Sequence, residues 1–314
     1  MKIKRIVMGV VILTLVLFGS YALDQSMYLS MEASAFDVLD SKDLESLEIE
    51  AYPMATYSFG DINEEGLKGY ANLSLPYQMG DSLDTLFPYF YSETFYRFQK
   101  PETESLLHIG LRTHFERIQA SNSTILDLMG LGAFYPINNM EEVWTSDRYS
   151  HYSDGVRLGF GMEAGATLVN LLEDAATTTT VHAAPVVRIN AGAELFDNFW
   201  VQANMLIYLP MVDYYTDSES FDYTASQTGS FSCSFVQERF QIMAGLDQRF
   251  TVYDLYTTSG LFKDTDYTYD FNPWASFNYT IMEDLNLYTG LYLYTTDGNL
   301  GPMYATIAID YFLI

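Results

Sequence analysis

The sequence predicts an all-β fold, a single transmembrane antiparallel β-barrel of about 14 strands, with twelve and sixteen strands left open. Three observations predict it. Polar and apolar residues alternate with period two along most of the chain, an export signal precedes the alternating part, and no later stretch is apolar and long enough for a membrane-spanning helix. Since one face of each strand suits hydrocarbon, we expect the strands to close into a ring within a bilayer.

The N-terminal segment has the features of a secretory signal peptide. Three basic residues precede an uncharged apolar run over 6–18, and small residues occupy Ser20 and Ala22, the two positions that a signal peptidase reads. The run is too short for a helix that crosses a bilayer, which needs ~20 residues. We therefore predict cleavage after Ala22, with 1–22 as the signal peptide and 23–314 as one barrel domain.

Composition narrows the class of protein further. Removal of the three basic residues of the signal leaves 12 basic against 41 acidic residues, a net charge of −29, which disfavours nucleic acid as a partner. Cys233 is the single cysteine, so an intramolecular disulfide is excluded. Aromatic residues make up 16% of the chain, with 26 tyrosines, and such amphipathic rings favour membrane interfaces.

Alternation is clearest over 187–195 and 199–209. In each segment the apolar residues share one face, and a three-residue break separates the two segments. Applied along the chain, the same criterion predicts a strand in each of fourteen segments. They are 27–36, 47–59, 67–78, 86–98, 105–118, 124–136, 157–171, 181–196, 198–212, 221–236, 240–253, 267–281, 285–296 and 302–313. Of these, 86–98 and 124–136 alternate poorly, and Pro53 and Pro273 interrupt two others.

The breaks between strands suggest an orientation. The breaks at 196–198, 237–239 and 282–284 are tight and fall on one side of the sheet, whereas the longer segments 213–220 and 254–266 fall on the other. Outer-membrane barrels have short periplasmic turns and longer external loops, so we expect the tight turns and both chain ends in the periplasm. The long segment 137–156 fits this arrangement poorly, which indicates either a short helix there or a miscounted strand.

The last predicted strand, 302–313, places apolar residues on one face and ends in Tyr311-Phe312-Leu313-Ile314. In this respect the chain resembles bacterial outer-membrane β-barrel proteins, which close with an amphipathic, aromatic-containing strand that the barrel-assembly machinery recognises. The resemblance implies a lipid bilayer as surroundings and the outer membrane of a diderm bacterium as location. Ile314 departs from it, since those proteins usually end in an aromatic residue. The likeness concerns architecture and assigns no subfamily.

Charged residues occupy many positions that the alternation places inside the barrel. A lumen lined in this way is either wet or cross-linked by ion pairs, and rings of Asp and Glu favour cations. We therefore predict a passive or weakly cation-selective diffusion pore for small hydrophilic or cationic solutes. The alternative is a plugged structural or surface-interaction barrel in which the same charges only pair and solvate. The expected pore-lining residues are Glu48, Glu50, Arg112, Glu163, Arg188, Glu194, Asp247, Arg249 and Asp270.

A second alternative is a lipid hydrolase. The segment 151–155, His-Tyr-Ser-Asp-Gly, looks like the His-x-Ser-Asn-Gly element of outer-membrane phospholipase A. The resemblance implies Ser153 as nucleophile and His151 as its base, with Glu163 as a candidate for the residue that orients the histidine. The chain departs from that pattern, because Gly165 stands where the third member is expected. The acidic clusters and the four histidines match no defined ligand spacing, so we expect neither metal nor cofactor.

Overall fold

The computed structural model describes residues 25–36, 48–60, 64–75, 77–79, 83–84, 89–100, 105–118, 123–140, 154–172, 180–215, 220–257 and 262–313. The predicted signal peptide and its cleavage site lie outside these residues. Within them, no helix is long and apolar enough to cross a membrane. The strands are β1 (Gln25–Phe36), β2 (Glu48–Phe59), β3 (Gly66–Ser74), β4 (Tyr77–Met79), β5 (Leu83–Asp84), β6 (Tyr89–Lys100), β7 (Ser105–Ile118), β8 (Ser123–Asn138), β9 (Gly155–Leu172), β10 (Thr180–Phe196), β11 (Phe199–Tyr215), β12 (Ser220–Val236), β13 (Phe240–Thr257), β14 (Phe262–Met282), β15 (Leu285–Thr296) and β16 (Asn299–Phe312).

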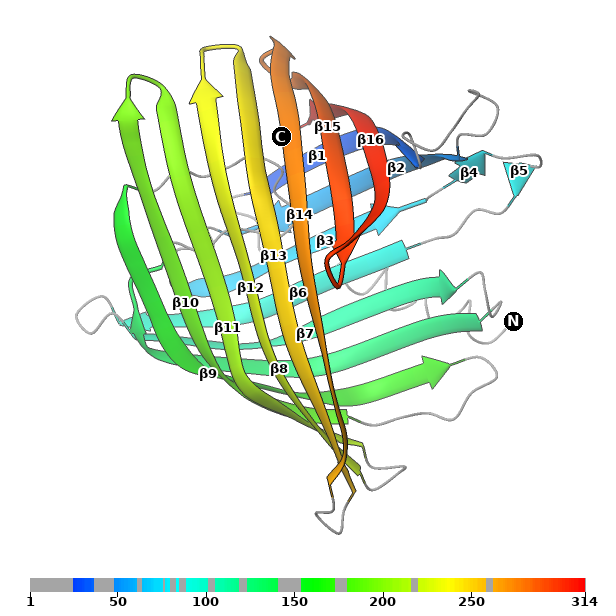
Figure 1. The fold of residues 1–314 in the computed structure, drawn as a ribbon, viewed down its shortest axis with the longest axis vertical. Coiled ribbons are helices and arrows are strands. Elements are labelled where there is room, and N and C mark those ends of the chain that lie inside the picture. The colour runs from blue at the N-terminus through cyan, green and yellow to red at the C-terminus, as the bar shows by residue number, and fades with distance from the viewer. Residues whose placement is uncertain are drawn as a thin grey trace.

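Fourteen of these strands form a closed antiparallel barrel, which confirms the predicted fold class and strand number. Each long strand pairs with its neighbours in the chain, and β1 pairs with both β2 and β16 (Figure 1). At the closure, Ser30 lies opposite Asp310 on one side and Met54 on the other. The short strands β4 and β5 extend the ladder of β2 and are not part of the ring. Each strand of the ring therefore has two neighbours, as a bilayer requires, although the part of β14 before Trp274 has a ladder only with β13.

The two faces of the sheet differ in polarity as the alternation predicts. On β9, the apolar residues Val156, Leu158, Phe160 and Met162 are between 47% and 65% exposed, while the glycines between them are turned inward. A water-soluble protein of this size rarely exposes so continuous an apolar surface. The outer face therefore fits lipid, and the same pattern repeats around the ring through Ile109 on β7, Phe231 on β12, Ile242 on β13 and Ile307 on β16.

Prolines stand where the ladders are interrupted, because proline has no amide hydrogen to donate. Pro53 lies between the part of β2 that pairs with β4 and the part that pairs with β3, and Pro273 lies where the pairing of β14 with β15 stops. The remaining strand prolines coincide with register shifts: Pro136, Pro185, Pro210 and Pro302. The two prolines that weakened the sequence prediction thus occupy positions that cost no ladder bond.

Three of the tight turns lie at one rim of the barrel, and the two-residue turn Asp297-Gly298 between β15 and β16 lies at the other. The hairpins β10–β11, β12–β13 and β14–β15 all turn at the upper end in Figure 1. Phe312 donates its amide hydrogen to the carbonyl of Asp284 at 2.9 Å, which places the end of β16 at this same rim. The segment between β8 and β9 also connects at this rim, and because the count of fourteen holds, a miscounted strand does not explain its length. Which rim faces the periplasm stays a prediction.

Two buried apolar clusters pack against the wall. The first contains Leu106, Tyr135, Ala184 and Val186, contributed by β7, β8 and β10, and it lies on the inner face. The second contains Phe59, Ala71 and Phe90 and lies on the outer face of β2, β3 and β6. The inner cluster fills the space beside the wall at the level of Val186, so the lumen is not lined by polar groups alone.

Candidate functional site in the barrel lumen

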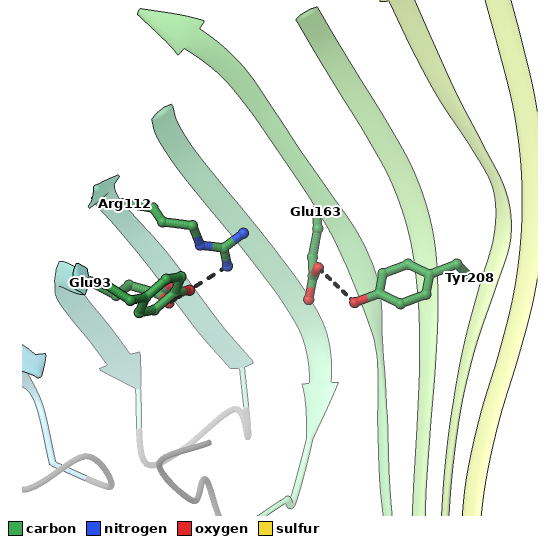
Figure 2. Close-up of polar contacts among 5 residues, drawn as sticks. Glu93, Arg112, Glu163 and Tyr208 are labelled. Carbon is green, nitrogen blue, oxygen red and sulfur yellow. Dashed lines mark hydrogen bonds and ion pairs between the residues drawn. The ribbon is translucent and has the colours of Figure 1, made fainter. Parts of the chain in front are cut away.

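An ion pair joins two neighbouring strands on the inner face. Arg112 on β7 lies directly opposite Glu93 on β6, and the guanidinium Nη2 is 3.6 Å from the carboxylate Oε2. The hydroxyl of Tyr91 donates to the same carboxylate at 3.1 Å, and Arg112 also lies over the Tyr91 ring, 5.7 Å from its centroid. The pair is drawn in Figure 2. These contacts hold the Arg112 side chain against the inner face of β6 and β7 and fix the position of its positive charge.

A carboxylate on β9 is held by two tyrosines. Glu163 accepts a hydrogen bond from the hydroxyl of Tyr135 on β8. It accepts a second from the hydroxyl of Tyr208 on β11, at 3.5 Å, which Figure 2 shows. Arg188 on β10 lies over the Tyr135 ring, 5.6 Å from its centroid. The neighbouring Gly161 makes room, because a Cβ there would lie 2.6 Å from the Tyr135 ring. Together these contacts join four adjacent strands, β8 to β11, on the inner face.

Positive charge is distributed unevenly around the ring. The described strands β15, β16, β1 and β2 are consecutive in the barrel and contain no lysine or arginine. Their inward positions carry carboxylates, namely Glu32, Glu50 and Asp310. The inward basic residues lie on the remaining strands of the ring: Lys68 on β3, Arg97 on β6, Arg112 on β7, Arg157 on β9, Arg188 on β10 and Arg249 on β13. One wall is therefore acidic and the rest of the ring is mixed, so any ion inside experiences a transverse field.

A cavity of about 310 Å³ lies against the acidic wall and is lined from β1, β13, β14, β15 and β16. Two carboxylates reach it, Glu32 and Asp247, together with the indole of Trp274. The rest of the lining comprises Met243, Ser276, Tyr288, Tyr292, Tyr304 and Thr306. Glycines shape the wall around it, since a Cβ at Gly245 would lie 2.6 Å from the Trp274 ring. The cavity combines acidic groups with aromatic faces.

The groups around this cavity are held by local contacts. Tyr292 and Tyr304 stack with their centroids 4.8 Å apart and their planes 11° from parallel. Glu32 Oε1 accepts a hydrogen bond from Thr306 Oγ1 at 2.9 Å and a longer one from Ser34 Oγ at 3.2 Å. The hydroxyls of Tyr288 and Tyr292 form a hydrogen bond with each other. The aromatic and acidic walls are therefore preorganised, which lowers the entropic cost of binding.

All nine residues predicted to line the pore stand on the inward register of their strands. Arg249 lies opposite Asp270, and Asp247 lies opposite Asn272. Glu194 is exposed at the tight-turn rim and accepts the amide hydrogen of Asn198 at 2.8 Å. For Glu48 the structure gives the strand position only. That solutes pass along the set Glu48, Glu50, Arg112, Glu163, Arg188, Glu194, Asp247, Arg249 and Asp270 stays a prediction.

The hydrolase alternative gains no support from the geometry. His151 and Ser153 lie outside the described residues, so their mutual geometry is not defined. Asp154, the next residue, is exposed just before β9. Glu163, the third candidate, is bound by two tyrosine hydroxyls within the wall. Across the part of the chain that the structure describes, no three His, Cys, Asp or Glu side chains gather in a way that could hold a metal ion.

Sequence reasoning missed several inward residues. Glu93 and Arg97 fall on β6, where Tyr89 and Phe90 put aromatic rings on both faces and hide the alternation. A search for a carboxylate on the neighbouring strand opposite Arg112 would have identified Glu93, because the two residues form an ion pair. The cavity had no sequence signal, because β1 and β13 are more than 200 residues apart in the chain.

The fold and the lumen define a closed antiparallel β-barrel with an apolar outer face. No protein-family model and no curated protein matches the sequence. Among solved structures, the chain is similar to the outer-membrane channel DcaP of Acinetobacter baumannii, with 9% identity over 92% of this chain and 96% of that one and a TM-score of 0.45. An outer-membrane channel of Pseudomonas putida F1 gives 11% identity, coverage of 94% and 98%, and a TM-score of 0.40. The KdgM porin gives 9% identity, coverage of 90% and 98%, and a TM-score of 0.32. All three are bacterial outer-membrane barrels, and the likeness is one of architecture.

Proposed function

We propose that the protein is an outer-membrane diffusion pore that prefers cations. The observation that carries the proposal is the acidic wall of β15, β16, β1 and β2, on which Glu32 and Glu50 point inward and no described residue is a lysine or arginine. Fourteen strands enclose a ring wide enough for an aqueous passage unless side chains fill it. Inward carboxylates lower the energy of a passing cation and raise that of an anion.

The arginines on the facing wall do not cancel this preference. Arg112 is paired with Glu93, and Arg188 lies on the Tyr135 ring, close to the carboxylate that Tyr135 contacts. Their charges are thus partly compensated on their own side of the lumen. Arg249 lies opposite Asp270, so its charge is likewise offset on its own side. Lys68, Arg97 and Arg157 also have the inward register, so the acidic wall is expected to give weak selectivity in place of exclusion.

The test is a planar-bilayer recording from the refolded mature chain in a KCl gradient. We expect discrete conductance steps and a reversal potential whose sign indicates preference for cations. The double variant Glu32→Gln, Glu50→Gln is expected to move the reversal potential toward zero, whereas Glu238→Gln, in the exposed turn between β12 and β13, is not. Silence from a barrel whose heat-modifiable migration shows that it has folded would overturn the pore and favour the plugged alternative.

A further inference from the structure

We propose that the cavity between β1 and β13–β16 binds small organic cations, of the alkylammonium class. The inference rests on the proposed function in one respect, since a ligand reaches this cavity through the lumen. It goes further because it assigns a specific binding site to the acidic wall. Diffusion of cations requires only that the wall be acidic. A volume of about 310 Å³ lies at the lower end of the range of small-molecule sites, so a small ligand is indicated.

Charge selects a cation. Glu32 and Asp247 both line the cavity, and its described lining contains no lysine, arginine or histidine. The hydrogen bonds from Ser34 and Thr306 to Glu32 come from neutral hydroxyls, which orient the carboxylate without neutralising it. Two carboxylates on one small cavity repel each other and an anionic ligand, and a cation between them relieves that repulsion.

Aromatic faces select an organic cation over a metal ion. Trp274 and the stacked pair Tyr292–Tyr304 form part of the lining, and such rings attract ammonium groups over their faces. A hard metal ion would instead require a cage of several oxygen ligands, and among the described residues no three His, Cys, Asp or Glu side chains gather to supply one. Alkyl substituents on the nitrogen match the apolar rings, while its charge matches the carboxylates.

One buried polar atom in the wall points independently to a ligand. Ser276 is only 6% exposed, lines the cavity, and its Oγ has no hydrogen-bond partner among the described residues. A buried hydroxyl without a partner costs free energy, and proteins normally satisfy such groups or use them. A ligand with a hydroxyl beside its ammonium group, such as choline, offers Ser276 a partner.

The test measures binding without requiring conductance. The chain has three tryptophans, so the variant Trp144→Phe, Trp200→Phe leaves Trp274 as the only reporter. This protein, refolded in detergent micelles, is titrated with choline and with its neutral isostere 3,3-dimethyl-1-butanol while Trp274 fluorescence is recorded. We expect a saturable change with choline and an affinity at least about tenfold lower for the isostere, which lacks the charge.

Variants separate the site from general acidity. Glu32→Gln and Asp247→Asn, each introduced alone, are expected to weaken choline binding about tenfold, while Glu238→Gln in the exposed turn leaves the affinity unchanged. Heat-modifiable migration confirms that each variant has folded. If Glu32→Gln does not fold, Asp247→Asn alone tests the contribution of the carboxylates. No saturable change with choline, or an equal response to the isostere, overturns the proposal. A barrel that binds choline but does not conduct would overturn the pore and leave this site standing.

Discussion

Tyr208 on β11 reaches across the whole of β10 to donate a hydrogen bond to Glu163 on β9, with the two oxygens 3.5 Å apart. Backbone ladders connect only adjacent strands, so this contact adds a tie between second neighbours. It also places a carboxylate at a fixed height in the lumen. The two hydrogen bonds to Glu163 differ in length and burial, and they should differ in energy.

Loss of the long bond should cost little, and loss of the carboxylate should cost more. Tyr208→Phe removes a hydrogen bond of 3.5 Å and is expected to lower the free energy of unfolding by about 0.5 kcal/mol. Glu163→Ala also removes the carboxylate that accepts the hydrogen bond from the hydroxyl of Tyr135, which is only 1% exposed. This variant is expected to lower the free energy of unfolding by about 1–3 kcal/mol. Urea unfolding in lipid vesicles measures both. Tyr279→Phe, on the outward register of β14, is the control, and equal losses in all three variants would contradict the argument.

Gly161 should tolerate no side chain. A Cβ at this position would lie 2.3 Å from the carbonyl oxygen of Phe134, which is backbone and cannot move aside. Gly161→Ala is therefore expected to lower the free energy of unfolding by about 1–3 kcal/mol. At Gly132 the nearest atom is 3.8 Å away, so Gly132→Ala should change it by less than about 0.5 kcal/mol. Urea midpoints that fail to separate the two variants would show that β8 and β9 are less closely packed than described.

A charge on the outer face should be far less tolerated than one on the inner face. Leu158 is 47% exposed within the apolar band of β9, and Leu158→Arg is expected to cost about 2–4 kcal/mol of stability in a bilayer. Gln202 on β11 has the inward register, and Gln202→Arg should cost less than about 1 kcal/mol because the lumen is polar. Unfolding from vesicles of defined lipid distinguishes the two. A larger loss at Gln202 would mean that inner and outer faces are assigned the wrong way round.

The turn between β15 and β16 depends on glycine. Asp297 and Gly298 have φ of 51° and 75°, the left-handed region that a two-residue hairpin of this kind requires, and a Cβ at Gly298 would lie 2.4 Å from the hydroxyl oxygen of Tyr269. Gly298→Val is expected to cost about 1–2 kcal/mol in urea unfolding. Asn198 has φ of 64°, so Asn198→Gly should be nearly neutral there. A destabilising Asn198→Gly would indicate that the asparagine side chain holds its turn.

The sequence was sufficient for the strands and their faces because period-two alternation is a local property that a bilayer imposes on each strand separately. It failed on β6, where aromatic rings occupy both faces, and on β8, where apolar residues such as Met129 and Leu131 also occupy the inward register and the register shift after Phe134 reverses the phase near the end of the strand. It also missed the start of β16 at Asn299, although Asp297-Gly298 is a strong hairpin signal.

Candidate site residues were harder to predict than the fold. Alternation places a carboxylate inside, but it does not give its height in the barrel or its neighbours around the ring. Those follow from the accumulated register, including every bulge, and from the closure between β1 and β16. Glu32 and Asp247 therefore meet at one cavity for reasons that no local window of sequence contains.

The pairing of the first strand with the last makes assembly all-or-none. Synthesis delivers β1 early, but its second partner, β16, is the last of the fourteen ring strands in chain order. Until then both β1 and the most recent strand present unpaired edges, which are templates for aggregation and intolerable in lipid. A chain that stops short of β16 is thus not a smaller barrel but an open sheet, because only the pairing of β16 with β1 closes the ring.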